Sequence, residues 1–261
     1  MSNVLGNHRT VEAADGHAGI QQVVVVIPAH NEEQRLGRCL AAVCHAMNVL
    51  QSAEPGIQIL CVLVLDACTD DSQRAADAVV AGDARFASID SHFRSVGAAR
   101  QLGVSEGLLR LRASSALPSA STWVASTDAD SVVPEHWLLT QVQMAQDGAD
   151  AVLGTVEPEP SGADPAILRL WHGRHSLTEN HSHIHGANLG ARASAYVVSG
   201  GFPALETHED RILVTEMRQR GYRVVATDRI RVITSSRTEG RAPEGFGSYL
   251  RSLAEPGSTT H

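Results

Sequence analysis

The chain has 261 residues, of which 43% are hydrophobic and 19% charged, with a formal net charge of −8. A chain of this size and composition can bury a substantial core. Its acidic balance argues against a nucleic-acid binder, which needs basic residues facing phosphates. Apolar runs such as Val23–Ile27 are too short for a membrane span, and the N-terminus lacks the apolar stretch of a signal peptide. A cytoplasmic protein without a membrane span is therefore expected.

Strand and helix patterns alternate along the first half of the chain. Residues 1–20 are polar and rich in Gly and Ala, which indicates a flexible leader. The β-branched run Gln22–Ile27 predicts a strand buried on both faces. Asn31 is then a candidate N-cap, with acidic residues in the first turn of a helix whose apolar spacing runs from Leu36 to Met47. The pattern continues with a strand, a helix, a short strand, a helix and a strand near residues 57–65, 75–79, 87–89, 95–108 and 123–126.

This β-α-β alternation predicts an α/β fold, with a mostly parallel central sheet flanked by helices. In such sheets ligands bind outside the carboxyl ends of the strands. Polar clusters stand at three of the expected strand ends: His30–Glu32, Asp66–Asp71 and Asp128–Asp130. Their coincidence predicts one ligand site at this edge of the sheet.

Asp128 and Asp130 are separated by one residue, so in an extended chain both side chains project from one face. Two carboxylates held close together repel each other unless one is protonated or a cation lies between them. Mg²⁺ or Mn²⁺, which bind carboxylates together with substrate phosphates, would relieve that repulsion. The alternative for an isolated Asp-X-Asp is a solvated loop after a strand.

Four segments together resemble family 2 glycosyltransferases of the GT-A fold, which use nucleotide-diphosphate sugars. The resemblance extends from about Val23 to about Arg241. Its pieces are the strand and turn VVVVIPAHNEE (23–33), the strand end VLDACTDDS (64–72), TDAD (127–130), and GANLG (186–190) followed by Glu209–Asp210. The second piece departs from the Asp-Asp-Ser-Ser-Thr-Asp that the family more often carries.

The resemblance implies one GT-A domain over residues 21–245, with a nucleotide-sugar half (21–130) and an acceptor half (131–245), followed by a tail (246–261). It implies metal-dependent glycosyl transfer of the hexosyl type from a UDP- or GDP-linked donor to an acceptor hydroxyl. A homodimer is left open. The implied nucleotide-sugar contacts are Pro28, Ala29, Asn31, Glu32, Asp66, Arg100 and Asp128.

The resemblance also implies a division of chemical roles. Asp130 would bind Mn²⁺ or Mg²⁺ directly, and Asp128 would bind the ribose, or the metal through water. Asp210 would be the catalytic base that deprotonates the acceptor, supported by Glu209, with inversion at the anomeric carbon. A purely structural interpretation of Glu209–Asp210 is a helix N-terminus, where acidic residues are favoured. The two interpretations are compatible, because a helix start would hold the base in place.

Departures from the family pattern leave alternatives open. Many inverting members carry Gln-X-X-Arg-Trp after the Glu-Asp pair, whereas residues 234–241 read TSSRTEGR. A processive polysaccharide synthase is not expected. Arg237 and Arg241 are assigned to the donor, with a solvated basic stretch as the alternative. His208 could be a third metal ligand of a retaining enzyme. A sugar nucleotidyltransferase and a catalytically silent binding module are the remaining alternatives.

The segment 168–185 is expected to form an acceptor wall that includes Trp171, for which core packing is the structural alternative. Within this segment His181, His183 and His185 alternate, which predicts that they share one face of an extended chain. A polar pocket wall is favoured over a zinc site, because no fourth ligand accompanies them. The remaining acceptor contacts implied by the resemblance are Gly186, Ala187 and Asn188.

Overall fold

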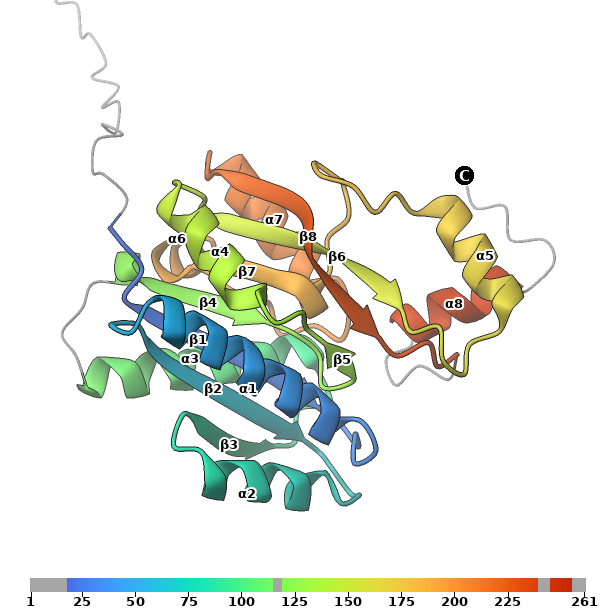
Figure 1. Cartoon of the computed structure of the whole chain (residues 1–261), viewed down its shortest axis with the longest axis horizontal. Helices are drawn as coiled ribbons and strands as arrows, with labels where there is room; N and C mark the ends of the chain where they lie inside the picture. Colours follow the sequence, from blue (N-terminus) through green and yellow to red (C-terminus); the bar gives the residue numbers. More distant parts are fainter. Residues whose placement is uncertain (1–17, 115–118, 239–244, 255–261) are drawn as a thin grey trace, which may run out of the picture.

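An eight-stranded mixed sheet runs through the computed structural model, which describes residues 18–114, 119–238 and 245–254. The strand order is β3-β2-β1-β4-β7-β6-β8-β5 (Figure 1). The strands are β1 (Gln22–Ala29), β2 (Gln58–Asp66), β3 (Phe86–Ser91), β4 (Thr122–Ser126), β5 (Ser131–Val132), β6 (Ala151–Pro158), β7 (Leu189–Arg192) and β8 (Val224–Thr234).

The first half of the sheet is parallel, as the alternation of elements predicts. β1 pairs in parallel with β2 and β4, and β2 pairs in parallel with β3. Every residue of β1 is buried, because helices cover both of its faces. This explains why Val23–Ile27 is a continuous apolar run rather than an alternating one.

The second half mixes directions. β7 is antiparallel to both β4 and β6, β6 is parallel to β8, and the two-residue β5 is antiparallel to β8. The register of β6 on β8 shifts between Gly154 and Val156. The mostly parallel sheet that the sequence predicts is confirmed.

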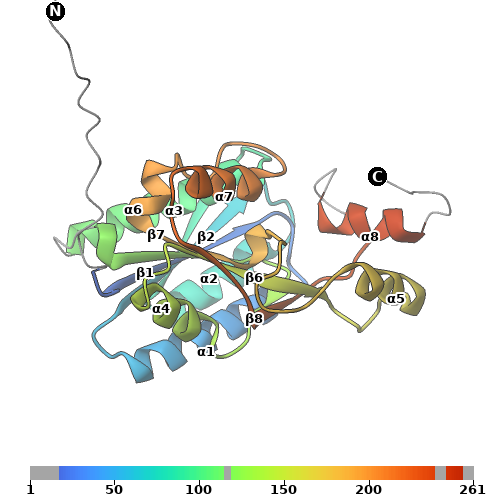
Figure 2. The ribbon, with the colours of Figure 1, turned by 90° about the horizontal axis from the view of Figure 1, so that it is seen from above.

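Helices cover both faces of the sheet. α1, α2 and α4 lie on one face, and α3, α6 and α7 lie on the other (Figures 1 and 2). The helices are α1 (Leu36–Ala53), α2 (Ser72–Gly82), α3 (Val96–Ser114), α4 (Trp137–Gln146), α5 (Pro165–Arg174), α6 (Ala193–Val198), α7 (Glu209–Gln219) and α8 (Phe246–Ala254), with short 3₁₀ turns at Ser119–Ser121 and Gly186–Asn188. Within the described ranges, none of these helices combines the length and apolarity that a membrane crossing requires.

Helix α3 approaches β1 closely through two glycines. A Cβ placed on Gly103 would lie 2.6 Å from Cγ1 of Val26, and one on Gly107 would collide with Cγ1 of Val24. Glycine inside a helix costs about 1 kcal/mol relative to alanine. The close packing of α3 on the sheet offsets that cost and sets the position of the helix start near the carboxyl ends of the strands.

Helices α5 and α8 pack on each other beside the sheet (Figure 1). Ile167 and Trp171 of α5 and Leu250 and Leu253 of α8 form a separate buried cluster. The region from residue 246 on, expected as a tail, therefore begins with a helix. Its amphipathic pattern is the signal that a sequence argument could have used.

Two local expectations are corrected. Asn31 is not an N-cap, because α1 begins at Leu36 with Arg35 at its cap and no acidic residue in its first turn. Of the leader expected over residues 1–20, residues 1–17 lie outside the described part, and Ile20 is buried in the core.

Candidate active site

A pocket of about 1200 Å³ opens at the carboxyl ends of β1, β2 and β4. The starts of α3 and α7 and the end of β8 complete its wall. Fourteen of the residues predicted for the site line it: Pro28, Ala29, Asn31, Glu32, Asp66, Arg100, Asp128, Asp130, Gly186, Ala187, His208, Glu209, Asp210 and Arg237.

The turn after β1 is tied to the end of β2. Asn31, in the left-handed region at φ 55°, accepts a hydrogen bond on Oδ1 from the backbone N–H of Thr69 at 2.6 Å. The backbone N–H of Glu32 donates to Oγ of Ser72 at 2.7 Å. Asn tolerates this backbone conformation better than most residues do. These hydrogen bonds hold the turn after β1 against the loop after β2, and both segments line the pocket.

Asp66 organises the loop that follows β3. Its Oδ1 accepts from Oγ of Ser91 at 3.0 Å and from the N–H of Phe93 at 2.7 Å, and its Oδ2 accepts from the N–H of Ser95 at 3.0 Å. Both oxygens of this buried carboxylate are thus engaged within the protein. Asp66 shapes the pocket wall by holding this loop in front of α3.

Asp130 is held among other charges. Its Oδ2 lies 3.2 Å from Nη2 of Arg237, which also pairs with Glu32 at 2.6 Å. Burial and, next, repulsion by Asp128 raise the pKa of Asp130 to about 6, although Arg237 acts to lower it. Three carboxylates and one arginine thus leave an excess of negative charge at this end of the pocket.

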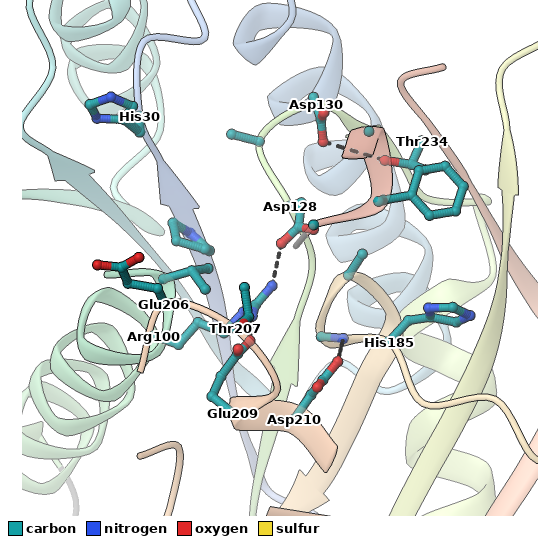
Figure 3. A pocket seen from close by; sticks show the side chains of 18 of the residues that line it. His30, Arg100, Asp128, Asp130, His185, Glu206, Thr207, Glu209, Asp210 and Thr234 are labelled. Carbon is teal, nitrogen blue, oxygen red and sulfur yellow. Dashed lines mark hydrogen bonds and ion pairs between the residues drawn. The ribbon is translucent and has the colours of Figure 1, made fainter. Parts of the chain in front are cut away.

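Arg100 is a buried bridge between the two halves of the site. Its guanidinium pairs with Asp128 and with Glu209 (Figure 3). Its Nε donates to Oγ of Ser126 at 3.1 Å. Burial lowers the pKa of Arg100, but Asp128 and Glu209 outweigh it, so the pKa is raised and the group stays charged. Gly186 lies against this guanidinium, where a Cβ would come within 2.5 Å of Nη1.

Glu209 and Asp210 form the first turn of α7, which confirms the helix start that the sequence predicts. Asp210 accepts from the N–H of Gly186 at 2.7 Å and from the N–H of Arg211 at 2.7 Å (Figure 3). Burial raises the pKa of Glu209, while Arg100 lowers it. The adjacent carboxylates therefore differ: Glu209 is buried in an ion pair, and Asp210 is half-buried at the pocket surface.

The donor set at Asp128 and Asp130 suits a hard divalent cation. Oxygen ligands and unbalanced negative charge are what Mg²⁺ and Mn²⁺ select. Within the described ranges, no group of three or more His, Cys, Asp or Glu side chains is placed to hold a metal by itself. A cation here would therefore need oxygens from a ligand such as a diphosphate. His208, in the left-handed region at φ 66°, lines the pocket but does not complete such a group.

Two of the predicted site residues, Trp171 and Asn188, do not line the pocket. Trp171 is fully buried between α5 and α8, where it stacks on His175. Asn188 is buried too: its Nδ2 donates to the carbonyls of Thr155 and Ile230 at 2.8 and 2.7 Å. Trp171 packs in the core, and Asn188 forms hydrogen bonds with backbone carbonyl groups, so neither side chain lines the pocket. Arg241 lies outside the described residues.

Several lining residues were not among the predicted ones. Thr234 ends β8 and Ser235 follows it, Arg94 and Ser95 precede α3, and Tyr249 comes from α8. The apolar alternation of residues 224–234 is a signal for a strand whose end would reach the site. The remaining residues reach the pocket only through tertiary packing.

Comparison with known proteins agrees with the resemblance in the sequence. The profile described as "Glycosyl transferase family 2" matches residues 24–196, more than half of the chain. No curated protein matches the sequence. Residues 1–349 of S. aureus TarS superpose with a TM-score of 0.55 at 14% identity, over 89% of this chain and 64% of that one.

Two further solved structures share the fold. GalNAc-T7 with UDP, GalNAc and Mn²⁺ has a TM-score of 0.60 at 13% identity, over 84% of this chain and 44% of that one. The mannosyltransferase PcManGT from Pyrobaculum calidifontis, with GDP-Man and Mn²⁺, has a TM-score of 0.56 at 15% identity, over 87% and 61%. The chain thus spans less than two thirds of the length of each of these proteins.

The α/β sheet with its pocket at the strand ends is the GT-A fold of glycosyltransferases. The chain belongs to glycosyl transferase family 2.

Proposed function

We propose that the protein transfers a glycosyl group from a nucleotide-diphosphate sugar to an acceptor hydroxyl, with Mn²⁺ or Mg²⁺ at Asp130 and Asp128 and with Asp210 as the base. The observation that carries the proposal is the ion-paired bridge of Arg100 between Asp128 and Glu209. It joins the acidic donor end of the pocket to the Glu209–Asp210 turn within one site.

The donor end provides what a departing nucleotide diphosphate needs. A cation held by Asp130 and Asp128 would neutralise the charge that develops on the diphosphate. Arg237, in contact with Asp130 and Glu32, would place a basic side chain beside that charge. GalNAc-T7 with UDP and Mn²⁺ and PcManGT with GDP-Man and Mn²⁺ support a UDP- or GDP-linked donor for this chain.

Asp210 fits the role of base better than Glu209 does. The carboxylate of Glu209 is buried against Arg100, whereas Asp210 lies at the pocket surface. Two backbone N–H groups orient Asp210. A general base must be held within hydrogen-bond reach of the proton it removes. The first turn of α7 holds Asp210 in a fixed position, as a general base requires. This favours inversion.

A retaining enzyme with His208 as metal ligand is the second candidate, because His208 lines the same pocket. The nucleotidyltransferase and the silent binding module have less support. The turn after β1 carries His30, Asn31 and Glu32 rather than a basic, glycine-rich phosphate loop. A binding module without catalysis would not need the carboxylates of both Asp128–Asp130 and Glu209–Asp210, yet all four side chains line one pocket.

The deciding experiment measures turnover of UDP- and GDP-sugars by the wild type, with and without Mn²⁺. Metal-dependent hydrolysis or transfer is expected. Asp130→Ala should abolish metal-dependent donor binding, measured by calorimetry. Asp210→Asn should keep donor binding and lose transfer by at least 100-fold, as expected for a general base. The anomeric configuration of the product, read by NMR, separates inversion from retention.

No binding or turnover of any nucleotide sugar by the wild type would refute the proposal. Transfer by Asp210→Asn at the wild-type rate would remove Asp210 as the base while leaving the donor assignment intact.

A further inference from the structure

Three imidazole rings line one side of the pocket in a row. These are His175, His183 and His185, named here the histidine wall. Their ring centroids are 5.2 Å apart between His175 and His183, and 5.9 Å apart between His183 and His185. His181 stacks behind His183 at 5.6 Å, and Trp171 stacks on His175 at 4.3 Å with nearly parallel rings. The buried Trp171 ring thus fixes one end of the row.

His183 and His185 are stacked, and the ring of His175 is tilted against that of His183. The planes of His183 and His185 are inclined by only 23°, and those of His175 and His183 by 32°. Rings stacked in this way turn their edges outward, and the edges of imidazole carry its nitrogens. The wall therefore offers hydrogen-bonding groups to a ligand, in contrast to an aromatic platform that offers a face.

The hydrogen bonds of the row indicate which nitrogen carries the proton. Nδ1 of His175 lies 2.8 Å from the carbonyl oxygen of Trp171, which can only accept, so Nδ1 is the donor and Nε2 keeps a lone pair. Nε2 of His181 lies 3.3 Å from the carbonyl of Thr227 and donates to it. Each neutral ring thus has one donor and one acceptor nitrogen, the same complement as a hydroxyl group.

The surroundings of His183 and His185 disfavour a positive charge on these two rings. Burial and, after it, the neighbouring His183 and His175 together lower the pKa of His185 to about 3. The pKa of His183 is lowered for the same reasons. The charged or titratable groups that face the row are Arg211 and Asp210 from α7, Asp228 from β8 and Tyr249 from α8.

One end of the histidine wall, His185, lies next in sequence to Gly186, which contacts Asp210, the proposed base. The contact is a hydrogen bond that the N–H of Gly186 donates to Asp210. A ligand along the wall would therefore place one of its groups next to that carboxylate. The residues between the histidines, Ser182 and Ile184, line the pocket and carry no charge.

We propose that the histidine wall is the acceptor subsite, and that the acceptor is an uncharged saccharide whose hydroxyls bond the imidazole edges. An anionic acceptor would call for arginine or lysine within the wall segment, and residues 175–185 carry neither. The cationic side chain that faces the row, Arg211, comes from α7 instead. This inference rests on the proposed function of Asp210, because it takes the acceptor to lie beside that residue.

The test measures transfer from the donor that the wild type uses to neutral mono- and disaccharides, and to a uronic acid and a sugar phosphate. Neutral saccharides are expected to be the better acceptors. His183→Ala should raise the acceptor KM at least tenfold, with a smaller change in kcat. His183→Asn, which keeps one donor and one acceptor, should recover most of the loss, and His183→Phe should not. His45→Ala, on the exposed outer side of α1, is the matched control.

The pH profile gives a second readout. The pKa values of His183 and His185 are lowered, so both rings keep an acceptor nitrogen in mildly acidic solution, and the KM for a neutral saccharide should change little between pH 7 and pH 5. A KM that rises about tenfold over this range, or rescue by His183→Phe rather than His183→Asn, would overturn the inference. Transfer only to the uronic acid or the sugar phosphate would overturn it while leaving the proposed function standing. No use of any nucleotide sugar would instead refute the proposed function, and the inference with it.

Discussion

Gly186 and Arg100 are in direct contact, and the contact leaves no room for a side chain on Gly186. A Cβ at this position would lie 2.5 Å from Nη1 and 2.6 Å from Cζ of Arg100. The backbone N–H of the same glycine donates to Asp210. Gly186 thus contacts both the guanidinium of Arg100 and the carboxylate of Asp210, the proposed base.

Gly186→Ala is expected to displace the guanidinium of Arg100 and to lower kcat by at least tenfold, because the ion pairs with Asp128 and Glu209 would be disturbed together. A misplacement of about 1 Å can cost on the order of 100-fold in rate. Steady-state transfer assays, with circular dichroism as a check of folding, measure the effect. Gly173→Ala in α5, whose Cβ would meet no described atom within 4 Å, is the control. Unchanged kcat in Gly186→Ala would contradict the steric argument.

Arg100→Met should destabilise the protein strongly, because Glu209 would remain buried without its partner. Removing one member of a buried ion pair typically costs about 3–5 kcal/mol. Urea unfolding measures the loss. The double variant Arg100→Met/Glu209→Gln should recover part of it, since the second change removes the unpaired charge. Additive losses in the double variant would show that the two side chains are not coupled.

The depressed pKa of His185 predicts a pH-dependent contribution to stability. Its pKa is about 3 in the folded state, compared with about 6.5 when unfolded. Between these values the unfolded chain binds the proton more readily, so His185 contributes fully above pH 6.5 and progressively less as the pH falls toward 3. The free energy of unfolding of the wild type should therefore fall relative to that of His185→Gln between pH 7 and pH 4, as measured by urea unfolding. If the difference in unfolding free energy between the wild type and His185→Gln stayed constant over this range, the pKa of His185 would not be lowered in the folded state.

Gly107→Ala tests the contact of α3 with the sheet. A Cβ there would collide with Val24, and overpacking of this kind typically costs about 1–3 kcal/mol. The matched control is Gly37→Ala in α1, where no described atom lies within 4 Å of the added Cβ. Because alanine is the better helix former, the control should gain up to about 1 kcal/mol. Thermal unfolding of both variants measures the contrast, and equal effects would argue against close packing at Gly107.

Local patterns were sufficient for the fold class and for the residues that follow strand ends. The β-branched run of β1 and the alternation of strands and helices predict a parallel sheet, and Pro28, Asp66 and Asp130 then share one edge of it. Glu209 and Asp210 begin a helix, as acidic residues before an apolar helical pattern indicate. These properties depend on the periodicity of the backbone and on sequence neighbours.

Residues whose roles depend on distant neighbours were assigned less well. Trp171 is an aromatic in a polar segment, yet α8, some 75 residues later in the chain, buries it. Asn188 satisfies the carbonyls of two strands that no local pattern pairs with it. The local pattern predicts Asn31 as an N-cap, whereas its side chain accepts a hydrogen bond from Thr69, which lies in another loop.

The sequence by itself determined the α/β architecture, the polar strand ends and the acidic start of α7, because each follows from residues adjacent in the chain. Only the tertiary structure decided that Arg100 joins Asp128 to Glu209, and that His175 completes a row with His183 and His185. Ion pairs and ring stacking act over a few ångströms of space between side chains that are up to 109 residues apart. Such contacts exist only once the sheet, α3 and α7 have brought their ends together.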